Sequence, residues 1–406
     1  MFHPTEILPH QEKQNRIAIC QSFLAHFCPD ASGLLISNRV NIYYCTGTLA
    51  NGYLWIPQKG APILFVRKAL ERAQLESPKT TIRPFRSFSS LYQYFSELGN
   101  IPESIAIEYG NLPYDMALRL QNKFPNTTLV NGDQILTRTR ARKSDWELQK
   151  MRQAGAIHEE AMMSYLPSIL RHDMTEHEIG VKLYTFLLNS GYGGPTRLGG
   201  FGQELFIGNV TVGDHGDYPN YFNGPQGNKG IHPATPYGGS QTPWRQGSLL
   251  TIDAGCTFHG YNTDKTTVYF AGSAHNIPEP ILKAHHCCLT IERTIAENLR
   301  PGAIPSHLYA QALSMATDAG FQEGFMGYKN NQVPFLGHGI GLVVDEWPVL
   351  AHKFELPLEE EMTLAIEPKI TLPGYGMVGT ENTYRVTPQG GESLTGEPSE
   401  LICIAK

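Results

Sequence analysis

Five ionisable side chains of this 406-residue chain stand in short apolar or glycine-rich segments, where a charge is costly to bury. They are Asp253 in LLTIDAG, Asp264 in DKTTVYF, His338 in FLGHGIGLVV, Glu367 in MTLAIEPKI and Glu381 in GMVGTENTYRVT. Four carboxylates and one imidazole repel one another when they are brought together, unless cations bind between them. We therefore expect a fold that gathers these five residues around two divalent metal ions.

The spacing of the five residues indicates how strands could bring them together. Asp253 and Asp264 are separated by ten residues, so a hairpin with its turn near His259 would place both on one face. Glu367 and Glu381 could lie on neighbouring strands joined by the intervening LPGYG loop. Carboxylate oxygens with one imidazole suit Mn²⁺, Co²⁺, Fe²⁺ or Zn²⁺ in five- or six-coordinate sites.

Composition excludes several other classes of protein. Hydrophobic residues make up 41% and charged residues 17% of the chain, an ordinary mixture for a soluble globular protein. The net charge of −6 and the absence of a basic run argue against nucleic acid as a partner. There is no run of 18 apolar residues and no apolar segment near the N-terminus, so neither a membrane span nor a secretory signal is expected. The seven scattered cysteines lack CxxC spacing and favour reduced thiols in a cytoplasmic protein.

The chain is predicted to divide into two domains, residues 1–140 and 141–406. The first alternates helical and strand patterns, which is typical of an α/β layer domain. Its expected elements include a helix over 11–27 and strands over 33–37, 41–47, 53–57 and 61–67. The basic segment TRTRARK, 137–143, is expected to be a linker. No phosphate-binding loop or dinucleotide fingerprint occurs in this domain.

The second domain shows an internal repeat. Capping boxes that open at Ser144 and Thr175 predict two helices, and a loop and the strands of Asp253 and Asp264 follow them. Two further helices, near 277–299 and from about 306, precede the strands that carry the other three residues. Two helix–helix–strand–strand units indicate a duplicated domain with a central site between its halves.

The ordered motifs D-x₁₀-D, GHGIG, IEP and a final strand Glu together resemble those of the pita-bread metallopeptidases. This family includes aminopeptidase P, prolidase, methionine aminopeptidase and the metal-free relative creatinase. NIYYCTG at 41–47 and TRTRARKSDWELQKMRQAGAI resemble the N-terminal domain and the domain junction of the prolidase, aminopeptidase P and creatinase branch. The resemblance implies an α/β (α+β) protein with a creatinase-like N-terminal domain and a duplicated pita-bread domain, whose central curved sheet is mostly antiparallel. It also implies a homodimer.

The resemblance implies a role for each of the five residues. Asp253 would chelate one metal ion, Asp264 and Glu381 would bridge two, and His338 and Glu367 would bind the second. The two ions would hold a bridging hydroxide that attacks a carbonyl carbon. Glu367 would also act as the catalytic proton shuttle to the leaving nitrogen. All five positions are intact, which separates this chain from creatinase.

Two more residues follow from the same resemblance. Thr266, two residues after Asp264, is a candidate for a residue that does not bind the metal itself but orients a metal ligand by a hydrogen bond. His232 is the candidate for the catalytic or substrate-binding histidine on the loop before Asp253, where it would polarise the carbonyl. His215 is the alternative for that role.

Two positions depart from the proline-directed members of the family. Asp345 stands where those members usually carry a second histidine, and Gly379 stands where they often carry an arginine. A carboxylate at 345 favours a cationic or donor-rich substrate group, so we expect Asp345 to bind substrate and the requirement for proline to be relaxed.

The sequence thus predicts a dinuclear metal-dependent hydrolase of short peptides, similar to Xaa-Pro aminopeptidases and dipeptidases. The same metal site acting on a non-peptide small molecule, as an amidohydrolase or a lyase, is the alternative. A non-catalytic binding protein on this fold is the third possibility. The expected partner is a short peptide or small amide substrate.

Overall fold

The computed structural model describes residues 3–206 and 208–405, which divide into two compact units between Arg140 and Ala141. No helix within these described ranges is long and apolar enough to cross a membrane.

The first unit is a six-stranded mixed sheet with helices. Its helices are α1 (His10–Phe27), α2 (Arg39–Thr46), α3 (Leu70–Glu76), α4 (Phe88–Glu97), α5 (Tyr114–Lys123) and α6 (Asp133–Ala141). Its strands are β1 (Gly33–Ile36), β2 (Gly52–Pro57), β3 (Ile63–Val66), β4 (Thr81–Pro84), β5 (Ser104–Ile107) and β6 (Thr128–Asn131). They lie in the order β4-β3-β2-β1-β5-β6, antiparallel from β1 to β3 and parallel elsewhere.

Two expectations for this part of the chain were wrong. The segment 41–47 was expected to be a strand because it is aromatic and β-branched, but it lies in helix α2. The Asn38 side chain accepts hydrogen bonds from the backbone N–H groups of Val40 and Asn41, at 2.8 and 3.3 Å, and starts the helix. Gly47 ends it in the left-handed conformation, at φ 83°. Likewise, the expected linker 137–143 is helical as far as the end of α6.

The second unit contains two successive sets of helices and strands. The first set is α7 (Asp145–Glu159), a π-helical turn η1 (Glu160–Tyr165), α8 (Leu166–Ile169), α9 (Glu176–Asn189), β7 (Gly208–Val212), the 3₁₀ turn η2 (Gly213–Asp217), β8 (Leu249–Phe258) and β9 (Tyr261–Ala271). The capping boxes at Ser144 and Thr175 both form, as predicted, and begin α7 and α9.

The second set likewise begins with helices and continues with strands. It comprises η3 (Ala274–Asn276), α10 (Glu279–Glu297), α11 (Pro305–Asp318), η4 (Lys329–Asn331), β10 (Phe335–Gly339), β11 (Glu346–Ala351), β12 (Thr363–Ile366), β13 (Lys369–Leu372), β14 (Gly376–Gly379), β15 (Asn382–Thr387), β16 (Gly390–Ser393) and β17 (Ile402–Ile404). The strands form sheets in the orders β17-β9-β8-β7 and β11-β10-β12-β15-β16, with β13 and β14 as a separate pair.

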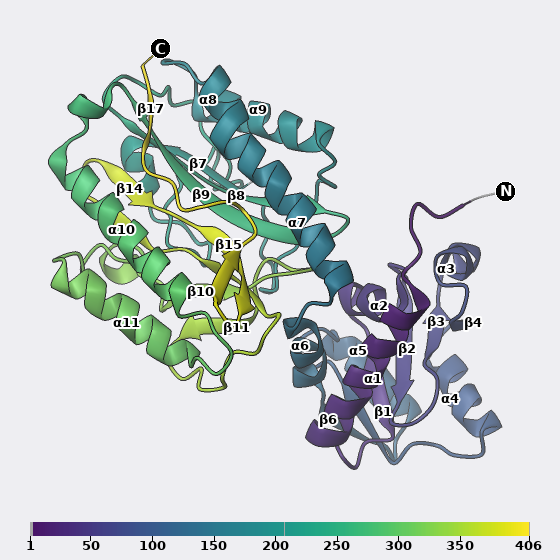
Figure 1. Ribbon diagram of the computed structural model, residues 1–406. Coiled ribbons are helices and arrows are strands. Elements are labelled where there is room, and N and C mark those ends of the chain that lie inside the picture. The colour runs from purple at the N-terminus through teal and green to yellow at the C-terminus, as the bar shows by residue number, and fades with distance from the viewer. Residues whose placement is uncertain (1–2, 207, 406) are drawn as a thin grey trace. The chain divides into compact units, whose positions relative to one another are not determined.

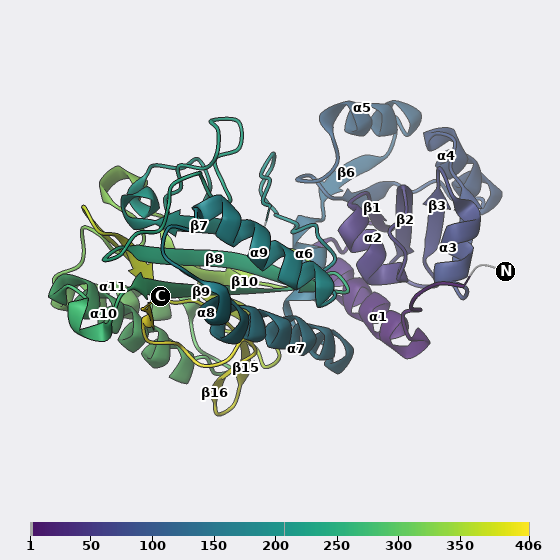
Figure 2. The same cartoon turned by 90° about the horizontal axis from the view of Figure 1, so that it is seen from above.

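The sheets of the second unit lie between its two sets of helices (Figure 1). Helix α7 packs on β8 and β9 and α9 on β7, whereas α10 packs on β13, β14 and β16 and α11 on β10 and β11. The long strands β8 and β9 run side by side through this unit (Figure 2). Among the residues of this unit that the structure describes, the strand pairs are antiparallel except β17 with β9. A bridge between Thr266 and Glu381 joins the two larger sheets, so the centre of the unit is built from both halves.

Candidate metal centre and substrate cavity

The hairpin of β8 and β9 places the two aspartates on one face, as predicted. His259 and Gly260 form its turn with φ values of 49° and 90°, the geometry that a tight two-residue hairpin requires. Asp253 lies opposite Thr266, and Asp264 lies opposite Gly255. Because residues two apart and residues directly opposite share a face, both carboxylates and the Thr266 hydroxyl point the same way.

The second half of the unit supplies the other three residues. His338 lies in β10. Glu367 and Glu381 both lie at the open end of the β13–β14 hairpin, two residues before β13 begins and two residues after β14 ends. Two groups of three residues could each hold a metal ion, because the ligand atoms within each group lie within 4.8 Å of one another. One group is Asp264, His338 and Glu381, and the other is Asp253, Glu367 and Glu381. The structure therefore brings together all five residues that stood out in the sequence.

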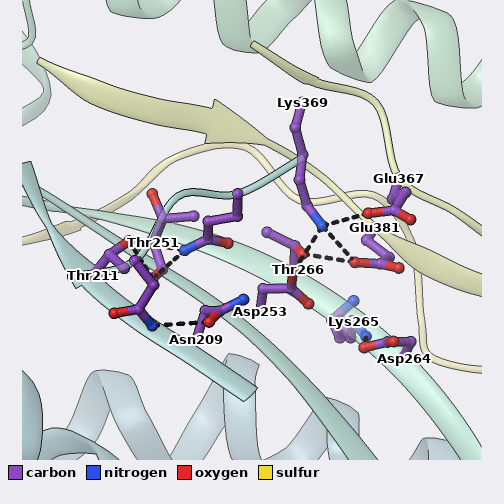
Figure 3. A network of polar contacts seen from close by, with 12 residues as sticks. Asn209, Thr211, Thr251, Asp253, Asp264, Lys265, Thr266, Glu367, Lys369 and Glu381 are labelled. Carbon is purple, nitrogen blue, oxygen red and sulfur yellow. Dashed lines mark hydrogen bonds and ion pairs between the residues drawn. The ribbon is translucent and has the colours of Figure 1, made fainter. Parts of the chain in front are cut away.

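A sixth residue, Lys369, lies among them and was missed by the sequence reasoning. Its ammonium Nζ is 2.9 Å from Asp253 Oδ2, 2.8 Å from Glu367 Oε2 and 2.9 Å from Glu381 Oε2. Figure 3 shows the lysine side chain reaching into the carboxylate cluster, with dashed lines to all three. The side chain is 0% exposed. Its signal in the sequence was a second charged residue in the apolar segment MTLAIEPKITL.

Burial and charge oppose each other in this cluster. Burial raises the pKa of the Asp264 carboxyl well above its ordinary value, and the charge of Asp253 adds to the rise. Burial likewise raises the pKa of Glu381. Burial by itself would lower the pKa of Lys369, but the three carboxylates around it raise that pKa well above the ordinary value. The cluster is therefore a site that demands positive charge.

The donor set fits one divalent cation. Asp264, His338 and Glu381 offer two carboxylates and an imidazole, which suit Mn²⁺, Co²⁺, Fe²⁺ or Zn²⁺. His338 Nε2 also lies 3.6 Å from Glu367 Oε1, so Glu367 borders this group. Each member of the second group, Asp253, Glu367 and Glu381, contacts the Lys369 ammonium with one oxygen, so a second ion would have to compete with the ammonium for these carboxylates.

Thr266, the residue predicted to support a metal ligand, contacts one of the candidate metal ligands. Its hydroxyl donates a hydrogen bond of 2.8 Å to Glu381 Oε2. Its neighbour Lys265 points to the opposite face of β9 and donates to Asn382 Oδ1. The hydroxyl of Thr266 thus helps to orient Glu381.

A cavity of about 360 Å³ opens onto the cluster. All five predicted ligands line it, together with apolar side chains that include Phe222, Phe335, Trp347, Val349 and Phe354. Asp345 also lines this cavity, and its Oδ1 accepts a hydrogen bond from the backbone N–H of Gly199 in the glycine-rich loop before β7. Asp345 therefore lies beside the site and in contact with a loop that also lines the cavity.

The two histidine candidates lie away from the cavity. His232 is exposed, and its Nδ1 accepts a hydrogen bond of 3.1 Å from the backbone N–H of Ala234. His215 Nδ1 lies 2.9 Å from Glu176 Oε1, a buried carboxylate at the start of α9. Among the residues that the structure describes, neither lines the cavity, so a catalytic role for His232 stays a prediction that requires its loop to move.

The fold and this cluster define a metal-dependent peptidase, and comparison with known proteins agrees. Residues 149–388 match the model of metallopeptidase family M24, and residues 29–142 match the creatinase/prolidase N-terminal domain. The chain belongs to metallopeptidase family M24. Its family implies divalent metal ions as cofactors.

Several curated relatives cover almost the whole chain. An Xaa-Pro dipeptidase of Pyrococcus horikoshii is 27% identical over 372 residues, which span 91% of this chain and 94% of the relative. A probable dipeptidase PepE of Mycobacterium tuberculosis is 26% identical over 385 residues, which span 92% of each chain.

Solved structures confirm the fold. The prolidase from Pyrococcus horikoshii OT3 matches with a TM-score of 0.78 and 25% identity, covering 95% of this chain and 99% of its own. Dipeptidase PepE from Mycobacterium ulcerans matches with a TM-score of 0.81 and 23% identity, covering 99% and 100%. The predicted fold class, a creatinase-type N-terminal domain followed by a pita-bread domain, is confirmed.

Proposed function

We propose that this protein is a metal-dependent dipeptidase, which hydrolyses the peptide bond of dipeptides and other very short peptides. The observation that carries the proposal is the cluster of Asp264, His338, Glu367 and Glu381 at the base of a small cavity. Relatives that span nearly its whole length are named as Xaa-Pro dipeptidase and dipeptidase PepE, which supports this substrate class.

The size and lining of the cavity favour a short substrate. Its volume of about 360 Å³ lies at the low end of the range of about 300–1,000 Å³ that is typical of small-ligand sites. Its aromatic side chains can bury the side chains of a dipeptide. Two carboxylates, Asp345 and Glu346, also line it, but Glu346 is already paired with the buried Lys143 Nζ at 3.3 Å. Asp345 is therefore the carboxylate that we assign to the substrate ammonium group.

The chemistry follows from the residues at the base of the cavity. A divalent ion bound by Asp264, His338 and Glu381 would supply Lewis-acid polarisation of the scissile carbonyl and would make water more acidic. Glu367 lies next to this group and has the carboxylate needed to take a proton from the attacking water. It can then return the proton to the leaving nitrogen, which completes hydrolysis without a covalent enzyme intermediate.

The experiment is a dipeptide panel with and without proline in the second position, assayed with Mn²⁺, Co²⁺, Zn²⁺ and Fe²⁺. We expect turnover, and we expect Glu367→Gln to lower kcat by roughly 100-fold or more because the proton acceptor is lost. Glu355→Gln, at an exposed position, is the matched control and should retain full activity. Absence of turnover of every peptide by protein with metal bound would refute the proposal. Turnover of small non-peptide amides in that case would favour the amidohydrolase alternative, for which the departures at Asp345 and Gly379 are the reason.

The identity of the metal and the assembly are part of the same proposal. The donor set is equally suited to Mn²⁺, Co²⁺, Zn²⁺ and Fe²⁺, so elemental analysis of the purified protein has to distinguish them. We propose a homodimer from the resemblance to family members, and a monomer in light scattering at micromolar concentration would refute it.

A further inference from the structure

We infer that the ammonium group of Lys369 occupies one of the two cation positions of the centre, so that the protein binds a single divalent metal ion. The inference deepens the proposed function, because it depends on the same five ligands. It differs from the dinuclear centre that the resemblance implies.

The first argument is the position of the ammonium. Lys369 Nζ contacts one oxygen each of Asp253, Glu367 and Glu381, at 2.8–2.9 Å. These three residues are the members of the second group of candidate ligands. A cation of the protein itself therefore contacts all three carboxylates that a second metal ion would need. The first group keeps its own two ligands, Asp264 and His338, which Lys369 does not contact in any bond that the structure records among its described residues.

The second argument is that the backbone of the lysine is held by hydrogen bonds and its side chain is buried. Its backbone is paired with Gly379 across the β13–β14 hairpin, and its carbonyl oxygen accepts a 2.8 Å hydrogen bond from Met326 N–H. Because the side chain is 0% exposed, a second metal ion would have to displace a buried ammonium from the three carboxylates that compensate its charge. An uncompensated buried charge costs several kcal/mol, which opposes binding of that ion.

The third argument connects Lys369 with Gly379. A Cβ atom at position 379 would lie 2.6 Å from Lys369 Cγ and 2.7 Å from the carbonyl oxygen of Pro368, which is too close for any side chain. The carbonyl oxygen of Pro368 and the Cα atom of Lys369, which would lie 2.9 Å away, are backbone atoms, so this conformation of the hairpin excludes a side chain at 379. The arginine that proline-directed family members often carry at this position is therefore incompatible with the backbone conformation that places Lys369 in the cluster.

The charge of the centre agrees with one metal ion. Four carboxylates converge, and the ammonium compensates one of their four negative charges. One divalent ion compensates two more. The net charge that remains is −1. The same count with two divalent ions gives +1, and a hydroxide bound between the ions would bring it to zero, so the count permits one ion but does not by itself exclude two.

The test is the number of metal ions bound per chain. Purified protein is stripped with a chelator, reloaded with Mn²⁺, and measured by elemental analysis and by native mass spectrometry. We expect the wild-type protein to bind one ion. We expect Lys369→Met, which keeps the length of the side chain and removes its charge, to bind two, with affinity for the second ion roughly 100-fold higher than in the wild type.

Lys265→Met is the matched control. Lys265 is equally buried and follows Asp264 directly, but it contacts Asn382 rather than the three carboxylates. Its substitution should leave the number of bound ions at one. If Lys369→Met does not fold without metal, the wild-type measurement decides alone.

Two ions bound to the wild-type protein would overturn the inference, and so would a single ion bound to folded, fully loaded Lys369→Met. Neither result bears on peptidase activity, whereas failure to hydrolyse any peptide with one ion bound would refute the proposed function and leave this inference standing.

Discussion

The hydrogen bond from Thr266 to Glu381 permits a sharp test, because the next residue of β9 provides its opposite. Thr266 donates to Glu381 Oε2 at 2.8 Å. Thr267 is just as buried, but its hydroxyl has no hydrogen-bond partner among the residues that the structure describes. Replacing either threonine with valine keeps the shape of the side chain and removes only the hydroxyl.

The two substitutions should have opposite effects. Thr266→Val removes a buried hydrogen bond to a carboxylate, which should cost about 1.5–3 kcal/mol of the free energy of unfolding. Thr267→Val removes a buried hydroxyl that pairs with nothing, so stability should stay the same or rise by up to about 1 kcal/mol. The expected difference between the variants is therefore at least about 1.5 kcal/mol. At about 2–4 °C per kcal/mol for a domain of this size, their Tm values should differ by at least about 3 °C.

The assay is calorimetry of both variants and the wild type in the presence of a chelator, followed by metal titration. Because Thr266 orients a metal-ligand candidate, Thr266→Val should also weaken metal binding by about 10–100-fold, whereas Thr267→Val should not change it. Equal Tm values for the two variants, with equal metal affinity, would show that the hydroxyl of Thr266 does not support Glu381.

Three further predictions concern the surroundings of the site. Glu176→Gln should lower the free energy of unfolding by about 1–3 kcal/mol in urea titrations, because two buried backbone N–H groups lie 2.7 Å from its two carboxylate oxygens and an amide can accept from only one side. Glu178→Gln, an exposed change in the capping box that begins the same helix, should be nearly neutral, because an amide oxygen can still accept from Thr175 N–H. Burial and a neighbouring aspartate raise the pKa of Asp217 to about 7. Its contribution to stability is therefore present below about pH 4 and is lost as pH rises through about 7. Over this range the Tm of Asp217→Asn should fall less than the Tm of the wild type, and parallel curves of Tm against pH would contradict the pKa shift. Asp345→Asn keeps an acceptor for Gly199 N–H but removes the charge, so KM for dipeptides should rise roughly 5–10-fold with little change in kcat, and an unchanged KM would exclude contact with the substrate ammonium.

The hairpin and the capping boxes were predictable because their determinants are local. Ten residues between Asp253 and Asp264, with a His-Gly turn that accepts positive φ, are sufficient to place both carboxylates on one face. The capping boxes at Ser144 and Thr175 satisfy their own helix ends within four residues, so no distant contact can easily displace them.

Other features depended on contacts that no short segment contains. The aromatic run 41–47 has strand propensity, but Asn38 and Gly47 at its ends make it a helix, and propensity is weaker than capping in so short a segment. His232 lies in a long loop without periodicity, so its distance from the cavity could not be derived from the sequence.

Lys369 is the clearest case. A lone lysine in an apolar strand is usually at an edge, where its ammonium reaches water. Its actual partners include Asp253, which is 116 positions away in the chain and comes close only when both halves of the unit assemble. The lysine is evident in the sequence, but the carboxylates that it contacts can be identified only in the folded structure.

A cation that is part of the polypeptide has no dissociation constant. If Lys369 holds one of the two cation positions, that position is filled in every molecule as soon as the chain folds, however scarce metal is in the surroundings. Starvation for metal would then empty only one position, and the lysine would still hold Glu381, the carboxylate that both positions share, in place for the returning ion. Such a centre would supply less Lewis acidity than one with two metal ions, but it would be partly assembled before any metal binds.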